Sequence, residues 1–388
     1  MDIGIFQLLP APETLSDREV IEQALWEVDC AETGGYDSIW IAEHHLASFG
    51  LVGAPSVYAA AVAQRTLRVG IGYAVAVLPL HHPLRLAEEI AWVDNLSQGR
   101  VLVGVGPGFS PYELGAFGVP LDERQARLEE GTAILRTALS QPSFTHAGRF
   151  WNIPRVTLRP RPYRGSSPPF LRASSAPESL RQAALDGVPL LLGLKPTAQI
   201  AECIAAYRAC RSALGLSAAA IDREVAEFRV LRRVALAPSD GEALTDARQA
   251  LCWENAVGSR VHGAGGGDSG ANDGAAARLA GGTEVHDLPE VTGGCIGTPQ
   301  TVLRELAERR ALGIRHVIAW LSFGDLPYAK VRRSMELIRQ EVIPILAAKR
   351  RPEAVAPAPL HPTAAGDPAT GGGEPGLRMA CARPDDPA

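Results

Sequence analysis

Short runs rich in β-branched residues alternate along this chain with longer segments whose apolar residues recur at the spacing of an α-helix. Such alternation is typical of β–α units that build a parallel sheet. The runs predict eight strands, at residues 3–9, 36–42, 67–78, 100–105, 169–174, 188–193, 228–236 and 316–322. A helix is expected after each strand, for example at residues 17–33, 83–96, 122–139, 176–186 and 327–346.

Eight β–α repeats favour a closed (β/α)8 barrel over an open sheet, because closure leaves no strand edge to protect. Two insertions interrupt the repeat. Residues 143–159, after the fourth helix, alternate apolar and other positions and predict a hairpin. Residues 258–282, between the seventh and eighth strands, include nine Gly and predict a mobile loop near the barrel mouth.

The end of the chain has a different composition. Residues 352–388 contain eight Pro, five Gly and no aromatic residue, which predicts a disordered tail. The 388 residues are therefore expected to form one barrel domain over residues 1–351, followed by this tail.

Charge and cysteine content narrow the class of protein. The 38 Lys and Arg against 43 Asp and Glu give a net charge of −5 without a basic block, which argues against a nucleic-acid partner. No apolar run approaches the ~18 residues of a membrane span, and Asp2 stands where a signal peptide would be basic. The six cysteines form no C-x-x-C pair. We expect a cytoplasmic protein with reduced thiols.

The stretch Trp40-Ile41-Ala42-Glu43-His44-His45 comes where the second strand ends. Catalytic groups of barrels lie at such strand ends, and a histidine there suits a general base or a hydrogen-bond donor. The alternatives are a metal pair or a packed histidine, although the helical H-E-x-x-H zinc pattern is absent. A second pair, His81 and His82, opens the third helix and is interpreted as a solvated connection.

Three further groups suggest a ligand site. The glycines of residues 104–108 would let a flat ligand approach the fourth strand, whereas Pro107 weakens a dinucleotide interpretation. Ser174 and Ser175 precede the helix after strand five, where they either bind a phosphate or act as an ordinary N-cap. Arg124 and Arg127 share one helix face and either complete a phosphate clamp or pair with nearby glutamates.

Taken in order, several stretches resemble the bacterial luciferase family of flavin-dependent monooxygenases, and within it the luciferase α-chain. The resemblance covers residues 1 to about 346 and rests on the following stretches: Ile39-Trp40-Ile41-Ala42-Glu43-His44-His45, Val77-Leu78-Pro79-Leu80-His81-His82-Pro83, Leu96-Ser97-Gln98-Gly99-Arg100 and Gly297-Thr298-Pro299. Members of this family are (β/α)8 barrels that bind reduced FMN, delivered by a separate reductase. They add O2 to the flavin as a C4a-peroxide and pass one oxygen to a substrate.

The resemblance implies roles for individual residues. His44 matches the catalytic histidine. Ala74 and Val75 match a pair that lies against the isoalloxazine ring, joined in some members by a non-prolyl cis peptide. Ser174 and Ser175 match the phosphate-binding end of strand five, and Arg124 is nearest the phosphate arginine.

The sequence departs from the luciferase pattern on strand four. Gly106 and Pro107 stand where the luciferase chain has a reactive thiol and a phosphate arginine, so phosphate binding is expected to depend on Arg124 or Arg127 and the serine pair.

An FMNH2- and O2-dependent monooxygenase acting on a small organic substrate, such as a secondary metabolite of antibiotic biosynthesis, is therefore expected. An F420-dependent oxidoreductase and a non-catalytic flavin-binding subunit are the alternatives. The aromatic residues Phe6, Phe109 and Trp320 are candidates for lining an apolar or aromatic substrate pocket. A homodimer is implied by the resemblance alone.

Overall fold

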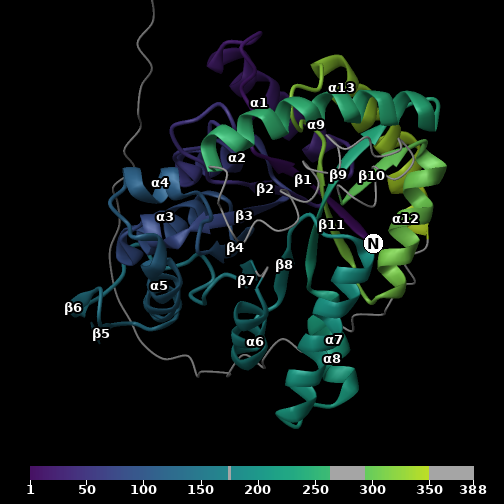
Figure 1. Ribbon diagram of the computed structural model, residues 1–388. Helices are drawn as coiled ribbons and strands as arrows, with labels where there is room; N and C mark the ends of the chain where they lie inside the picture. The colour runs from purple at the N-terminus through teal and green to yellow at the C-terminus, as the bar shows by residue number, and fades with distance from the viewer. Residues whose placement is uncertain (174–175, 263–292, 349–388) are drawn as a thin grey trace, which may run out of the picture. The chain divides into compact units, whose positions relative to one another are not determined.

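A ring of eight parallel strands forms the centre of the molecule (Figure 1). The computed structural model describes residues 1–173, 176–262 and 293–348. The ring closes because the first strand pairs with the last and the sixth pairs with the seventh. The (β/α)8 prediction is confirmed. Its strands, in order round the ring, are β1 (Asp2–Gln7), β2 (Ser38–Ile41), β3 (Gly70–Val77), β4 (Val101–Gly106), β7 (Phe170–Ala173), β8 (Leu190–Leu192), β9 (Arg229–Leu236) and β11 (His316–Trp320).

Helices surround this ring, and several have the predicted bounds. The first, α1, begins at a capping box in which the Ser16 side chain accepts from the Glu19 backbone N–H and the Glu19 carboxylate accepts from the Ser16 N–H. The helices along the barrel are α1 (Asp17–Thr33), α2 (Pro55–Arg65), α3 (Pro83–Leu96), α4 (Pro111–Ala116), α5 (Arg124–Ser140), α6 (Pro177–Asp186), α7 (Thr197–Ala213), α8 (Ala218–Ala226), α9 (Asp240–His262) and α12 (Pro299–Ala311).

The last predicted helix, residues 327–346, is not continuous. It consists of α13 (Tyr328–Leu337), a π-helical turn (Ile338–Val342) and α14 (Ile343–Ala348). Pro344 lies just after the π turn and has no N–H to donate to the α-helical ladder, which accounts for the interruption there.

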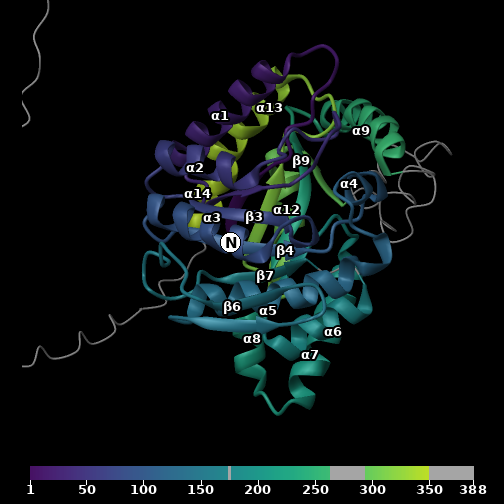
Figure 2. The ribbon, with the colours of Figure 1, turned by 90° about the vertical axis from the view of Figure 1, so that its left-hand side faces the viewer.

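The first insertion forms the predicted hairpin from β5 (Phe144–Ala147) and β6 (Asn152–Val156). Figure 2 shows the hairpin beside α5. The Glu130 carboxylate of α5 accepts backbone hydrogen bonds from Phe150 and Trp151, at 3.0 Å each, in the turn. This carboxylate therefore holds the hairpin against the barrel.

The second insertion differs from the prediction in two ways. Helix α9 continues to His262, so residues 258–262 are helical, and residues 263–282 of the predicted loop lie outside the described residues. An additional strand, β10 (Gly294–Gly297), pairs with the second half of β9. Four residues with Gly at both ends carry too little apolar pattern to predict it. The predicted tail, residues 352–388, also lies outside the described residues.

Trp40 of β2 fills the barrel interior. Its ring is fully buried, and the Arg229 guanidinium of β9 lies 5.9 Å from its centroid. Since β9 is three strands from β2 round the ring, this contact crosses the interior. On the neighbouring strand, Gly72 leaves room for the indole, because a Cβ there would lie 2.2 Å from Trp40 Cε3. Among the described residues, no helix is long and apolar enough to cross a membrane.

Candidate active site

His44 lies directly beyond β2, at the carboxyl-end mouth of the barrel. Its Nδ1 is 2.9 Å from Glu113 Oε1, and its side chain is 12% exposed. The rings of Phe49 and Phe109 pack edge to face with the imidazole, and their centroids lie 4.9 and 5.6 Å from its centroid. The carboxylate at Nδ1 and the edge-to-face packing of two aromatic rings thus fix the orientation of the imidazole.

Glu113 comes from α4, the short helix after β4. Its Oε1 also accepts a hydrogen bond from the His45 backbone N–H at 3.1 Å, and the residue is buried. Burial alone would raise the pKa of Glu113, but the hydrogen bonds and charge of His44 and His45 outweigh it and lower the pKa. An ionised carboxylate is therefore held against His44 at neutral pH.

A second buried carboxylate, Glu43, joins the ends of β2 and β3. It accepts from His45 Nε2 at 2.9 Å, from His81 Nε2 at 2.7 Å and from the Val77 backbone N–H at 2.7 Å. Burial acts to raise the pKa of Glu43, but these hydrogen bonds and the His81 charge lower it. Burial acts to lower the pKa of His81, but the contact with Glu43 raises it. The two carboxylates thus orient three histidines around one strand end.

Ala74 and Val75 form an irregular step in β3. Their peptide bond is cis, and the register between β3 and β4 shifts between Tyr73 and Ala76. Both residues are half-buried and apolar. On β4, Gly106 faces this step, since a Cβ there would lie 2.8 Å from Val75 Cγ2. The result is a small apolar surface near the mouth, next to a position where a larger side chain would displace Val75.

The three predicted substrate residues fall into two places. Phe109 follows β4 and lies against His44, with 38% of its surface exposed. Phe6 and Trp320 are buried on β1 and β11, and their rings meet edge to face at 5.5 Å. The Arg233 guanidinium lies 5.1 Å from the Trp320 ring and forms a buried ion pair with Glu254 of α9.

The predicted phosphate groups are only partly described. Arg127 donates to Glu123 Oε2 from Nε at 3.0 Å and Nη2 at 2.8 Å, and stacks on Phe150 at 4.5 Å. Its pairing with an acidic neighbour is one of the two alternatives that the sequence left open. Arg124 begins α5 and donates to the Leu121 carbonyl at 3.3 Å. Ser174 and Ser175 lie outside the described residues, so their phosphate role stays a prediction.

Two residues of this site, His81 and Glu113, were not predicted from the sequence. His81 was interpreted as part of a solvated connection, but its ring contacts Glu43. Its presence in a stretch matched by the family was the available signal. Glu113 lies in a segment that lacked any distinctive pattern. Its contact with His44 joins residues 69 positions apart and becomes visible only in three dimensions.

Comparison with known proteins defines the class. The model of the luciferase-like monooxygenase family matches residues 1–316. The chain belongs to this family, which confirms the resemblance.

Individual relatives carry monooxygenase names. A 4-hydroxyprotoasukamycin monooxygenase of Streptomyces nodosus subsp. asukaensis is 31% identical over 217 residues, covering 55% of this chain and 58% of the relative. The oxygenase component of a flavin-dependent trigonelline monooxygenase of Acinetobacter baylyi is 26% identical over 363 residues, covering 89% and 96%. An alkanal monooxygenase alpha chain of Photorhabdus luminescens is 30% identical over 193 residues, covering 50% and 53%. The chain spans about half the length of the first curated relatives it matches.

Solved structures share the fold over most of the chain. The monooxygenase RslO1 of Streptomyces bottropensis has a TM-score of 0.75 and 26% identity, covering 89% of this chain and 99% of that one. The oxygenating constituent of 3,6-diketocamphane monooxygenase of Pseudomonas putida, in complex with FMN, has a TM-score of 0.70 at 20% identity, covering 89% and 98%. An F420-dependent secondary alcohol dehydrogenase has 0.68 at 18% identity, covering 88% and 98%. At these last two identities the likeness concerns the fold alone.

Proposed function

We propose that this protein is the oxygenase component of a two-component monooxygenase that uses reduced FMN and O2. The observation that carries the proposal is the fixed His44–Glu113 pair beside the apolar step at Ala74 and Val75, at the mouth of a barrel of this family. Bound reduced flavin would supply two electrons to O2, so that one oxygen enters the substrate and the other leaves as water.

The ring end of a flavin fits this mouth. Ala74 and Val75 offer a half-buried apolar surface, and Gly106 leaves the adjoining space that a side chain would fill. For the phosphate end, we favour Arg124 with Ser174 and Ser175. Arg127 is engaged by Glu123 and so contributes less. Ala74, Val75, Gly106, Arg124, Ser174 and Ser175 are together proposed as the FMN site.

His44 is the proposed catalytic residue. Its imidazole takes and returns a proton during oxygen transfer, and the Glu113 carboxylate stabilises the ring while it carries that proton. Phe49 and Phe109 cover the ring and limit its contact with water. Glu113 does not need to touch the substrate and acts as a positioning residue.

The substrate is proposed to be an apolar or aromatic small molecule, bound near Phe109 and extending toward Phe6 and Trp320. The name of the Streptomyces nodosus relative supports a role in the biosynthesis of a secondary metabolite such as an antibiotic. A separate flavin reductase is the proposed partner, as the phrase "oxygenase component" in the Acinetobacter baylyi relative's name implies for that protein. A homodimer is proposed by family analogy.

One experiment separates this proposal from the F420 alternative, which the F420-dependent structural neighbour supports at the level of the fold. The purified protein is incubated with FMN, NADH and a generic flavin reductase under ¹⁸O2 with a panel of aromatic metabolites, and in parallel anaerobically with reduced F420. One ¹⁸O atom per product, lost in His44→Ala, is expected. Oxidation of reduced F420 without O2, and no labelled product, would contradict the proposal. Flavin binding with no turnover of either kind would favour a non-catalytic subunit.

A further inference from the structure

A cavity of about 480 Å³ opens on the amino-end face of the barrel. It lies where β4, β7, β8 and β9 begin, whereas His44 lies beyond the carboxyl end of β2. Its volume falls within the ~300–1,000 Å³ typical of small-molecule sites. No step of the proposed reaction uses this face.

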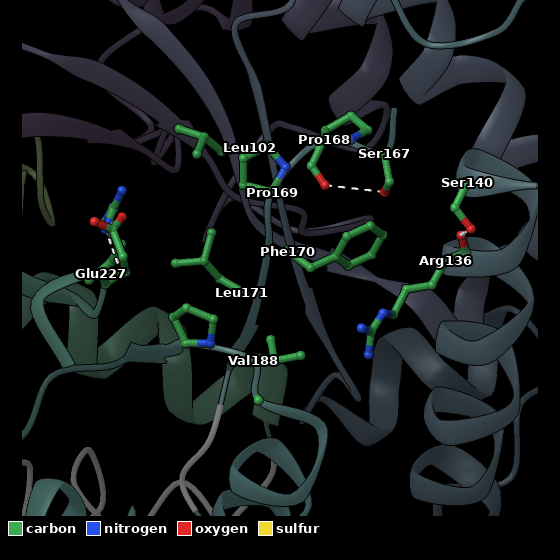
Figure 3. Close-up of a pocket in the computed structure, with 13 residues that line it drawn as sticks. Leu102, Arg136, Ser140, Ser167, Pro168, Pro169, Phe170, Leu171, Val188 and Glu227 are labelled. Carbon is green, nitrogen blue, oxygen red and sulfur yellow. Dashed lines mark hydrogen bonds and ion pairs between the residues drawn. The ribbon is translucent and has the colours of Figure 1, made fainter. Parts of the chain in front are cut away.

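Two arginines and one glutamate are the charged residues that line this cavity. Figure 3 shows Arg136 of α5 on one side and Glu227 on the opposite side, with Phe170 and Leu171 between them. Within the described residues, the exposed Arg136 guanidinium makes no hydrogen bond or ion pair. Arg229 Nη1 is 3.5 Å from the Glu227 carboxylate. The residues that line the cavity therefore carry two positive charges and one negative charge.

Arg229 adds a second, buried positive charge. Its side chain is only 8% exposed, and its Nε has no hydrogen-bond partner among the described residues. This Nε is itself buried, so a ligand in the cavity would act on Arg229 through its charge and not through a hydrogen bond to Nε. Burial lowers the pKa of Arg229, and the nearby Glu227 acts in the opposite direction. An anion in the cavity would offset this cost of burying the guanidinium.

The remaining wall is mostly apolar. Leu102, Pro168, Phe170, Leu171 and Val188 form the surface between the charged groups. Burial of an aliphatic or aromatic body here yields roughly 25 cal/mol per Å² of apolar area. Positive charge beside an apolar surface suits a small molecule that has an apolar body and a terminal carboxylate.

We propose that the amino-end face of the barrel is a second ligand site, specific for a small amphiphilic carboxylate. The carboxylate binds the Arg136 guanidinium, and the apolar body lies along Phe170 and Leu171. Because Trp40 fills the interior between this cavity and the mouth, occupation of the site does not compete sterically with flavin or substrate.

Octanoate is the probe, titrated into the full-length protein by isothermal calorimetry. 1-Octanol is the matched ligand without charge, and inorganic phosphate is the matched anion without an apolar body. Octanoate is expected to bind one to one. Arg136→Gln is expected to weaken it about tenfold, the contribution of one charge-assisted hydrogen bond. Arg18→Gln, which changes an arginine 86% exposed on α1, serves as the control and should have no effect.

Two further variants locate the bound molecule. Phe170→Ala should weaken octanoate by at least fivefold, with the thermal midpoint recorded for each variant, while Phe109→Ala at the mouth should leave the affinity unchanged. Any of four results overturns the proposal: no octanoate binding, equal binding of 1-octanol, equal or tighter binding of phosphate, or an affinity that responds to Phe109→Ala and not to Arg136→Gln.

Discussion

Replacing Glu113 by Gln tests whether this carboxylate acts through His44. The amide oxygen keeps an acceptor for the His44 Nδ1 and His45 N–H contacts, now 2.9 and 3.1 Å, but the negative charge is lost. A hydrogen bond to a charged group contributes ~1.5–3 kcal/mol, against ~0.5–1.5 kcal/mol for a neutral one. The difference of about 1–1.5 kcal/mol predicts a roughly fivefold to thirteenfold fall in kcat/KM.

The assay is product formation with FMN, a flavin reductase and the best substrate of the metabolite panel, measured for four proteins: wild type, Glu113→Gln, His44→Ala and the double variant. His44→Ala is expected to cost ~10²–10⁴-fold, the usual contribution of a general base. The double variant should match His44→Ala, because a positioning residue has nothing left to position. Glu178→Gln, at a glutamate 81% exposed on α6, is the matched control and should leave kcat/KM unchanged.

Additivity would refute this reasoning. If Glu113→Gln lowers kcat/KM by the same factor in the His44→Ala background as in the wild type, the carboxylate acts on something other than His44. An unchanged rate in the single variant would show that the charge beside the imidazole has no part in the reaction.

Three other perturbations have defined outcomes. Glu43→Gln should lower the free energy of unfolding by ~2–4 kcal/mol at pH 6. The pKa of Glu43 is lowered and that of His81 is raised in the folded protein. The Glu43–His81 contact therefore stabilises the fold most strongly at pH values between the ordinary pKa of glutamate and that of histidine. This stabilisation is lost as pH falls through the folded pKa of Glu43 and shrinks as pH rises through that of His81. Equal losses in urea unfolding at pH 6 and pH 9 would contradict this linkage. Gly106→Val should displace Val75 at a cost of ~1–3 kcal/mol and weaken FMN at least fivefold by fluorescence titration, whereas unchanged affinity would argue against a flavin ring at this step. Arg127→Gln should change FMN affinity by less than about twofold, and a tenfold loss would mean that the arginine leaves Glu123 to bind phosphate.

Much of the fold could be predicted because each barrel strand carries its own apolar run. Residues 17–33 and 83–96 were predicted as helices with the bounds of α1 and α3, since capping residues and N-terminal proline mark their starts. Two features escaped prediction for local reasons. Strand β10 is only four residues long, and the π turn before Pro344 depends on which backbone donors the helix can use.

Site residues within a recognisable motif could be predicted. Site residues brought together from distant parts of the sequence could not. His44 was identified from its strand-end position and its motif. Its partner Glu113 was not, because α4 is a short helix in a connecting segment and the contact is made across 69 residues. His81 was undervalued because sequence alone gives no sign that Glu43 points toward it. Buried carboxylates that organise histidines are tertiary features, and local pattern does not encode them.

The indole of Trp40 has a topological consequence. Its fully buried ring lies inside the barrel with the Arg229 guanidinium 5.9 Å from its centroid, so the indole separates the amino-end face from the carboxyl-end mouth. The proposed substrate and O2 would then enter, and the product leave, from the carboxyl-end mouth. A molecule bound at the amino-end face would therefore influence the mouth through the strands and not by direct contact.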